Sequence, residues 1–162
     1  MKAVSRNQPR TAEQLNRVAF PMGGIGAGML SLEGTGALSQ VSLRHKPDVN
    51  HEPQVFAALH VKGAKTARVL EGPVPMWKIM GSATGPTFSE PGNGLSGRTY
   101  GLPRFAKASF LARFPFATVS LSDPAMPVTA ELTGWSPFTP GAADDSSLPV
   151  AAIEYRFVNR SA

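Results

Sequence analysis

Val128-Thr-Ala-Glu-Leu-Thr133 and Ala151-Ala-Ile-Glu-Tyr-Arg-Phe-Val158 alternate apolar and polar side chains, and these two stretches decide the fold. Successive side chains of an extended chain point to opposite sides, so the alternation predicts strands that bury one face and leave the other in water. The expected buried faces are formed by Val128, Ala130 and Leu132 in the first strand and by Ile153, Tyr155 and Phe157 in the second.

Weaker or shorter stretches of the same kind recur along the rest of the chain. Val55–Lys62 alternates weakly, and the shorter candidates are Met29–Leu32, Val41–Leu43, Thr66–Leu70, Ser109–Ala112 and Thr118–Leu121. Several short strands joined by Gly and Pro turns, without a long helix, favour antiparallel sheets packed face to face. We therefore predict an all-β fold, an antiparallel β-sandwich. Because the chain stops just after a strong strand, we expect an incomplete portion of a larger sandwich domain.

Two segments fall outside this strand pattern. Thr11–Asn16 is expected to form one helical turn, with Thr11 as the cap and Gln14 at the capping-box position. Glu71–Arg104 is rich in Gly and Pro and has no strand periodicity, so it is predicted to be a long loop. Loops of this length are usually functional or belong to an interface.

The composition is that of an ordinary soluble globular domain, with 42% hydrophobic and 17% charged residues among 162. We divide the chain into a polar N-terminal arm, residues 1–17, and a domain, residues 18–162. The arm has no apolar run, so we expect neither a signal peptide nor a membrane anchor, and a cytoplasmic location. Without any Cys, disulfides and thiolate metal sites are excluded.

The net charge of +5 raises the question of nucleic-acid binding. The basic residues, however, are spread from Lys2 to Arg160 and form no cluster. Dispersed charge is typical of a solvated surface, so no nucleic-acid partner is expected.

Two glycine-rich stretches invite a phosphate-binding interpretation. Gly23-Gly-Ile-Gly-Ala-Gly28 is like a dinucleotide loop, but Phe20-Pro21 interrupts any preceding strand and no helix is expected after it. We favour a strand or tight turn at which two backbones pass closely. Gly92–Thr99 has Walker A spacing, but Arg98 replaces the lysine and no helix follows. We therefore predict no cofactor.

Candidate metal ligands and catalytic groups are equally sparse. The spacing of His45, His51 and His60 matches no metal site, so none is predicted. Glycoside hydrolysis needs two carboxylates that flank the scissile bond, and the only adjacent pair, Asp144-Asp145, lies in an expected turn. Other acids lie beside Gly or Pro in expected loops: Glu33, Asp48, Glu52, Glu71 and Glu90. No catalytic residue is predicted.

Four aromatic residues are candidates either for stacking on sugar rings or, more commonly in a β domain, for the core. They are Trp77, Tyr100, Phe105 and Trp135.

Seven segments, taken in order, resemble glycoside hydrolase family 116, which includes the non-lysosomal glucosylceramidase. They are Val18–Gly28, Phe56–Gly63, Leu70–Pro73, Gly101–Phe105, Phe114–Pro124, Trp135–Pro140 and Asp144–Pro149, the last leading into a strand that ends at Asn159-Arg160. One departure is clear: where many members have an Asp-Trp pair leading to Asn-Arg-Pro, this chain has Ser39-Gln40 and then Arg44-His45-Lys46-Pro47. Because of that change, the substrate preference of the familiar members is not assigned to this chain.

The resemblance implies an N-terminal β-sandwich domain packed on a C-terminal (α/α)₆ barrel that hydrolyses β-glucosides or glucolipids with retention. It also implies that both catalytic carboxylates belong to the barrel, so none is assigned here. Residues within the resembling segments are candidates for a loop or interface role: Arg104, Trp135, Asp144 and Asp145.

Two hypotheses of function remain open. The first is a non-catalytic domain, or a fragment of one, that supports the (α/α)₆ catalytic domain of a glucosylceramidase-like β-glucosidase. The second is a free-standing carbohydrate-binding or protein-interaction module.

Overall fold

The two alternating stretches form neighbouring strands in a computed structural model of the chain, which describes residues 7–49, 51–79 and 99–161. β9 (Val128–Trp135) and β10 (Ala152–Asn159) pair antiparallel along their whole length, with Tyr155 opposite Leu132. Both strand predictions are confirmed.

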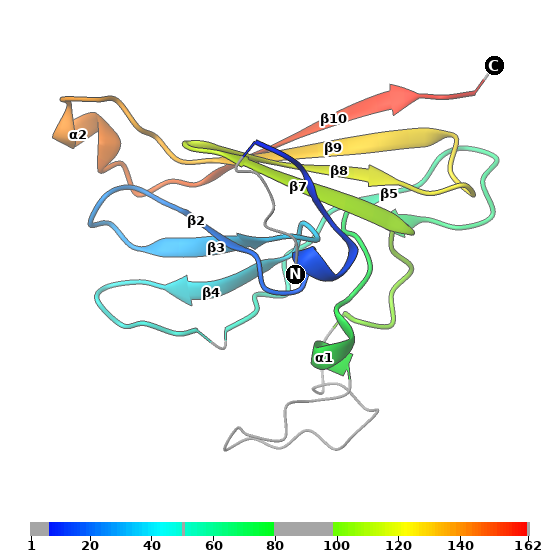
Figure 1. The fold of residues 1–162 in the computed structure, drawn as a ribbon, viewed down its shortest axis with the longest axis horizontal. Coiled ribbons are helices and arrows are strands. Elements are labelled where there is room, and N and C mark those ends of the chain that lie inside the picture. The colour runs from blue at the N-terminus through cyan, green and yellow to red at the C-terminus, as the bar shows by residue number, and fades with distance from the viewer. Residues whose placement is uncertain (1–6, 50, 80–98, 162) are drawn as a thin grey trace.

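These strands belong to a five-stranded antiparallel sheet with the order β1-β7-β8-β9-β10 (Figure 1). β7 (Lys107–Arg113) and β8 (Phe116–Ser122) form a hairpin, and β1 (Arg10–Thr11) pairs with the outer side of β7. The strands predicted at Ser109–Ala112 and Thr118–Leu121 are therefore present and extend further at both ends.

Two smaller sheets complete the fold. β2 (Ala19–Met22), β3 (Met29–Glu33) and β4 (Leu38–Ser42) form an antiparallel sheet that lies against part of the five-stranded sheet (Figure 1). β5 (Ala58–Leu59) pairs with β6 (Arg68–Val69). The predicted all-β, sandwich-like architecture is confirmed.

The core lies between the five-stranded and the three-stranded sheets. The two sheets pack closely at Gly134 of β9, because a Cβ atom there would lie 2.5 Å from the Met22 sulfur and 2.8 Å from a Leu32 methyl group. The buried apolar cluster comprises Leu15, Phe20, Met22, Leu32, Leu70, Phe105, Phe110, Ala117, Val119, Leu121, Met126, Ala130 and Leu132. Burial of these side chains is the main driving force for the fold.

Helical structure is confined to single turns among the described residues. The predicted turn is confirmed as the 3₁₀ helix η1 (Ala12–Leu15), where the Thr11 N–H donates to the Gln14 side-chain oxygen at 3.2 Å. α1 (Met76–Ile79) and α2 (Ala143–Ser146) were not predicted, and α2 replaces the turn expected around Asp144. Four residues are too few to produce a helical periodicity in the sequence.

The N-terminal arm is more involved in the fold than its polar sequence suggests. Arg10 and Thr11 pair with Phe110 and Ser109, and Leu15 joins the buried core. The division of the chain between residues 17 and 18 stays a prediction.

Several strand predictions need correction. Of Val55–Lys62, only Ala58–Leu59 forms a strand, because β5 pairs with one two-residue strand and has no second neighbour. The strand expected at Val41–Leu43 is shifted to Leu38–Ser42.

The prediction that Phe20-Pro21 interrupts any strand was wrong. Pro21 lies within β2, which is an edge strand, and at an edge a proline can sit where no ladder hydrogen bond is lost. Phe157 was expected on the buried face but is 47% exposed, because β10 is the outermost strand of its sheet.

The glycine run that starts at Gly23 packs against the end of α2 and the residues that follow it. The Ile25 N–H donates to the Ser146 carbonyl at 2.8 Å, and a Cβ at Gly24 would collide with the Leu148 carbonyl oxygen. The interpretation of this run as a close passage of two backbones is thus confirmed.

Gly24→Ala is expected to destabilise the protein by about 1–3 kcal/mol, because the added methyl group overpacks the contact with Leu148. Gly101→Ala is the matched control, since nothing lies within 4 Å of its Cβ position. Urea unfolding of both variants would measure the difference. Equal midpoints would contradict the close packing.

Candidate functional site

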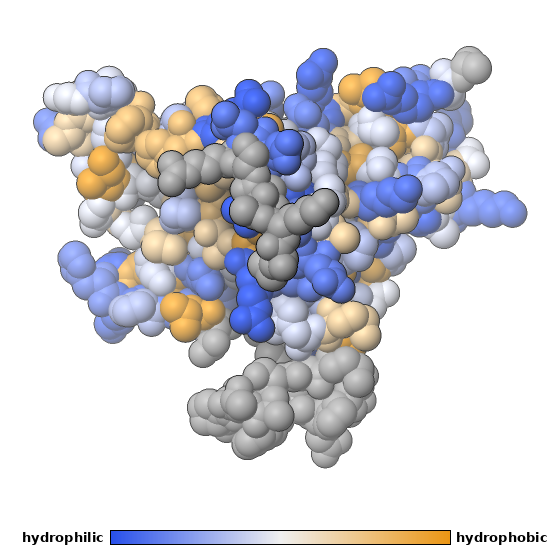
Figure 2. Space-filling model, viewed as in Figure 1, coloured by the Kyte–Doolittle hydropathy of each residue, from blue (hydrophilic) through white to orange (hydrophobic). Residues whose placement is uncertain are grey.

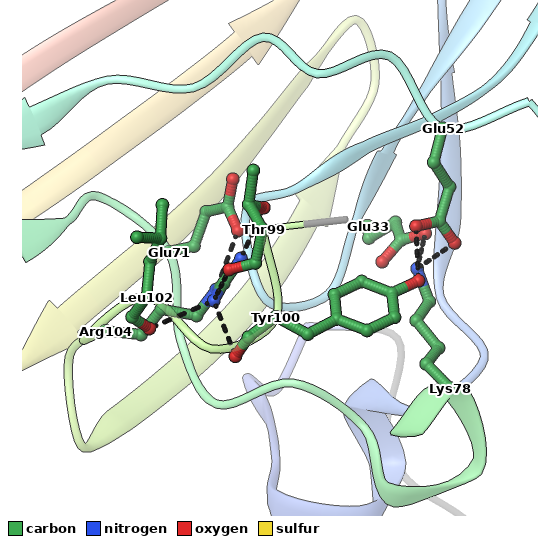
Figure 3. Close-up of polar contacts among 8 residues, drawn as sticks. All are labelled: Glu33, Glu52, Glu71, Lys78, Thr99, Tyr100, Leu102 and Arg104. Atoms are coloured by element: carbon green, nitrogen blue, oxygen red, sulfur yellow. Dashed lines mark hydrogen bonds and ion pairs between the residues drawn. The ribbon is translucent and has the colours of Figure 1, made fainter. Parts of the chain in front are cut away.

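Buried charges gather where the chain leaving β6 meets the chain entering β7. Glu71 follows β6 and is only 8% exposed, and Arg104 precedes β7. The Arg104 Nε donates to the Glu71 carboxylate at 3.0 Å. The Arg104 guanidinium also donates to the carbonyl oxygens of Thr99, Tyr100 and Leu102 and to the Thr99 hydroxyl (Figure 3).

A second group of charges lies beside this pair. Lys78 of α1 donates from Nζ to Glu33 at 2.6 Å and to Glu52 at 2.7 Å, and its side chain is almost fully buried. The Tyr100 hydroxyl donates to the other oxygen of Glu52 at 2.6 Å. Figure 3 shows Lys78 and Tyr100 converging on this carboxylate from different segments.

We call these residues the charge network: Glu33, Glu52, Glu71, Lys78, Tyr100 and Arg104. Its members lie on both sides of residues 80–98, because Lys78 precedes that stretch and Tyr100 and Arg104 follow it. Glu52 binds Lys78 and Tyr100 at once and thereby holds the two flanking segments together. Residues 80–98, most of the predicted long loop Glu71–Arg104, lie outside the described residues, but the first and last residues of that segment form an ion pair.

The charge network lines a small cavity of about 40 Å³. That is space for a few water molecules, because one water needs about 10–15 Å³ by this measure. Sites that enclose small-molecule ligands are about 300–1,000 Å³. The cavity is therefore too small to enclose a sugar ring.

Burial controls the titration of Glu71. Desolvation raises its pKa above the ordinary value of 4.5, and the neighbouring Arg104 only partly offsets the rise. A raised folded-state pKa means that the contribution of Glu71 to stability is fully present below pH 4.5 and is lost as the pH rises through its folded-state pKa. The ionised carboxylate is tolerated because Arg104 pairs with it.

The four predicted loop or interface residues do not come together. Arg104 lies in the charge network, at the end of the hairpin where Lys107 faces Ser122. Trp135 lies at the opposite end, where its ring packs on Phe116 with centroids 6.4 Å apart. Asp144 and Asp145 are exposed on α2.

Sequence reasoning missed most of the charge network. Both Glu33 and Glu71 are expected in loops from the sequence, but Glu33 lies in β3, and Glu71, which does lie outside the strands, is buried. The only signal in the sequence was the length of the Gly- and Pro-rich segment, whose two end residues pair. Of the four aromatic candidates, Phe105 is core and Trp77 is 48% exposed, with its indole N–H donating to the Asn16 carbonyl at 2.9 Å.

Among the described residues, the histidines singled out in the sequence form no metal or catalytic site. His45, His51 and His60 are exposed, and in the part of the chain that the structure describes no three His, Asp or Glu side chains are grouped to hold a metal ion. The Walker-like stretch Gly92–Arg98 and the acid Glu90 lie outside the described residues. No helix within the described ranges is long and apolar enough to cross a bilayer.

The fold and the charge network define an all-β domain whose buried charges are paired with one another. A family model described as "beta-glucosidase 2, glycosyl-hydrolase family 116 N-term" matches residues 19–162. The chain therefore belongs to the N-terminal domain family of family 116 glycosyl hydrolases. A search of curated proteins found no match.

Arg104→Met is expected to destabilise the domain by about 3–5 kcal/mol at neutral pH, because Glu71 would keep a buried, uncompensated charge. Acid should relieve part of this loss, since protonation of Glu71 removes the charge as the pH falls through its folded-state pKa. Urea unfolding of the wild type and the variant, compared at each pH, measures both effects.

The matched control is the double variant Arg104→Met with Glu71→Gln, which removes both charges and should be more stable than Arg104→Met alone. A double variant that is no more stable, together with a loss that does not change with pH, would contradict the role assigned to the ion pair.

Proposed function

We propose that this chain is a non-catalytic N-terminal domain, or part of one, of a glucosylceramidase-like retaining β-glucosidase. In this proposal it supports a separate (α/α)₆ catalytic domain in the cytoplasm, and β-glucosides or glucolipids are bound only through that domain. Membership of the N-terminal domain family is the observation that carries the proposal.

The carboxylates of the chain support a non-catalytic role. Retaining hydrolysis needs two carboxyl groups about 5–5.5 Å apart, one a nucleophile and the other a proton donor to the leaving oxygen. Glu33 and Glu52 lie close enough, because both bond the same nitrogen of Lys78. The Lys78 ammonium, however, occupies the space between them, so no glycosidic bond can lie there.

Glu71 is the acid whose environment most resembles that of a general acid, since burial raises its pKa. Its carboxylate is engaged by Arg104, and the adjoining cavity is far too small for a glucosyl unit. Asp144 and Asp145 are exposed on α2, where nothing excludes water from them. None of these acids is placed to act on a substrate.

The structural role we infer follows from the way the charge network holds its segments. Trp135, Asp144 and Asp145 are proposed to face the catalytic domain or the loops around its entrance, and Arg104 is proposed to support such an interface indirectly. Arg104 acts from within, by fixing the chain around Thr99–Leu102, whereas the exposed aspartates offer direct polar contacts.

The purified chain is expected not to hydrolyse an aryl β-glucoside or glucosylceramide at any pH, because the Lys78 ammonium bonds to both Glu33 and Glu52, the two carboxylates that line a groove of about 560 Å³. Release of the aryl group is followed by absorbance, with the no-enzyme rate as the baseline. Turnover above that rate, abolished by Glu33→Gln, Glu52→Gln or Glu71→Gln, would overturn the proposal.

A further inference from the structure

A groove of about 560 Å³ is lined by the N-terminal arm, the three-stranded sheet and α1, with Glu33 and Glu52 in its wall. All of the residues that line it lie between positions 16 and 77, so β10 takes no part in it. Around the arm, Figure 2 shows hydrophilic and hydrophobic residues interspersed rather than one continuous apolar patch. The volume of the groove falls within the range of about 300–1,000 Å³ that is usual for small-molecule sites.

Trp77 supplies a flat apolar surface in this groove. Its side chain is 48% exposed, and its indole N–H is already engaged, because it donates to the Asn16 carbonyl at 2.9 Å. This hydrogen bond fixes the orientation of the ring. Since the only polar group of the ring is occupied, Trp77 offers a ligand its carbon surface, which suits stacking on an apolar face.

Hydrogen-bond donors and acceptors line the same groove. Glu33 bonds Lys78 through Oε1, and no partner of its second oxygen is found among the described residues (Figure 3). The Gln40 side-chain oxygen accepts from the Ser31 hydroxyl at 3.0 Å, which leaves the two N–H groups of the amide as donors. Arg17 adds an exposed guanidinium. A ligand in the groove can therefore both donate and accept hydrogen bonds.

Gln40 is held in an unusual backbone conformation. Its φ of 54° lies in the left-handed region, where residues other than Gly are uncommon. The Gln40 backbone N–H donates to the His51 carbonyl at 2.7 Å, so both its backbone and its side chain are held by hydrogen bonds. Residues in such strained conformations persist only where the surrounding structure fixes them, and they cluster at ligand sites.

The charges around the groove cancel. Glu33 and Glu52 carry two negative charges, which are matched by the Lys78 ammonium that bonds both and by the guanidinium of Arg17. A charged ligand would lose its hydration on entering and would gain no net attraction in return. The groove therefore favours a neutral ligand with many hydroxyl groups and one apolar face.

We propose that this groove binds a free pyranose, a neutral sugar ring with C–H groups on its faces and hydroxyl groups around its edge. One C–H face of the sugar stacks on Trp77, while its hydroxyl groups donate to Glu33 and accept from Gln40 and Arg17. The sugar is held and not cleaved, because Lys78 bonds the two carboxylates of the groove. The choice of a free sugar over a glycoside rests on the proposed function, in which β-glucosides bind only through the catalytic domain.

Calorimetric titration of the purified chain with glucose tests this site. The wild type should bind glucose, and it should bind glucose 6-phosphate more weakly because the groove has no net charge to attract an anion. Trp77→Ala should weaken glucose binding about tenfold or more, since truncation of a stacked tryptophan removes its whole contact surface. Arg17→Gln should weaken it several-fold. Arg10→Gln is the matched control, because Arg10 lies in the same arm but does not line the groove.

Circular dichroism checks that each variant is folded. If Trp77→Ala fails to fold, proton NMR of the wild type gives an independent test: the indole signals of Trp77, but not those of Trp135, should shift as glucose is added. A wild type that binds no glucose, a folded Trp77→Ala that binds it equally well, or tighter binding of glucose 6-phosphate would each overturn the site and leave the proposed function standing. Methyl β-glucoside bound at this groove as tightly as glucose would contradict both the free sugar and the proposed function's claim that glycosides bind only through the catalytic domain.

Discussion

The close approach of the two sheets at Gly134 is the constraint on which the rest of the structure depends. Met22 and Leu32 fill the space that a side chain at this position would take, so the three-stranded sheet can reach the inner face of β9. The buried side chains of β8 and β9 then meet those of β2 and β3 in one cluster. Loss of that contact would expose the apolar faces of both sheets to water.

The charge network depends on this packing and adds a constraint of its own. Taking Glu71 and Arg104 out of water costs free energy, which their mutual attraction and the carbonyl partners of Arg104 offset. Glu52 also accepts hydrogen bonds from Lys78, which precedes residues 80–98, and from Tyr100, which follows them, so the two segments are held next to each other. Carboxylates used in this way are not available for hydrolysis, which links the stability of the domain to its proposed non-catalytic role.

The sequence predicted the five-stranded sheet better than any other part of the fold. One face of β9 and of β10 packs inward, so apolar and polar residues alternate along both strands and the alternation can be read from the sequence. β5 and β6 could not be bounded, since two-residue strands leave almost no pattern. β2 was missed because Pro21 argues against a strand unless its position at an edge is already known.

The charge network could not be predicted from the sequence for a different reason. Its members are far apart in the chain, and burial of a glutamate beside Gly and Pro depends on tertiary contacts that no local pattern records. The sequence singles out Arg104 as a candidate, but for its partner Glu71 it predicts only a position in a loop, with no sign of the burial. The exposed positions of Asp144 and Asp145, by contrast, follow from a short polar segment that has no apolar face to bury.

We propose that the chain is part of an enzyme whose catalytic carboxylates lie elsewhere in the polypeptide. The most direct measurement is the β-glucosidase activity of the polypeptide translated from the whole reading frame, with acids substituted one at a time inside and beyond these 162 residues. We expect activity to be abolished only by substitutions in a helical region after Ala162, while conservative changes of Glu33, Glu52 and Glu71 leave the protein active. A reading frame that ends at Ala162, or activity that depends on one of those three glutamates at unchanged stability, would contradict it.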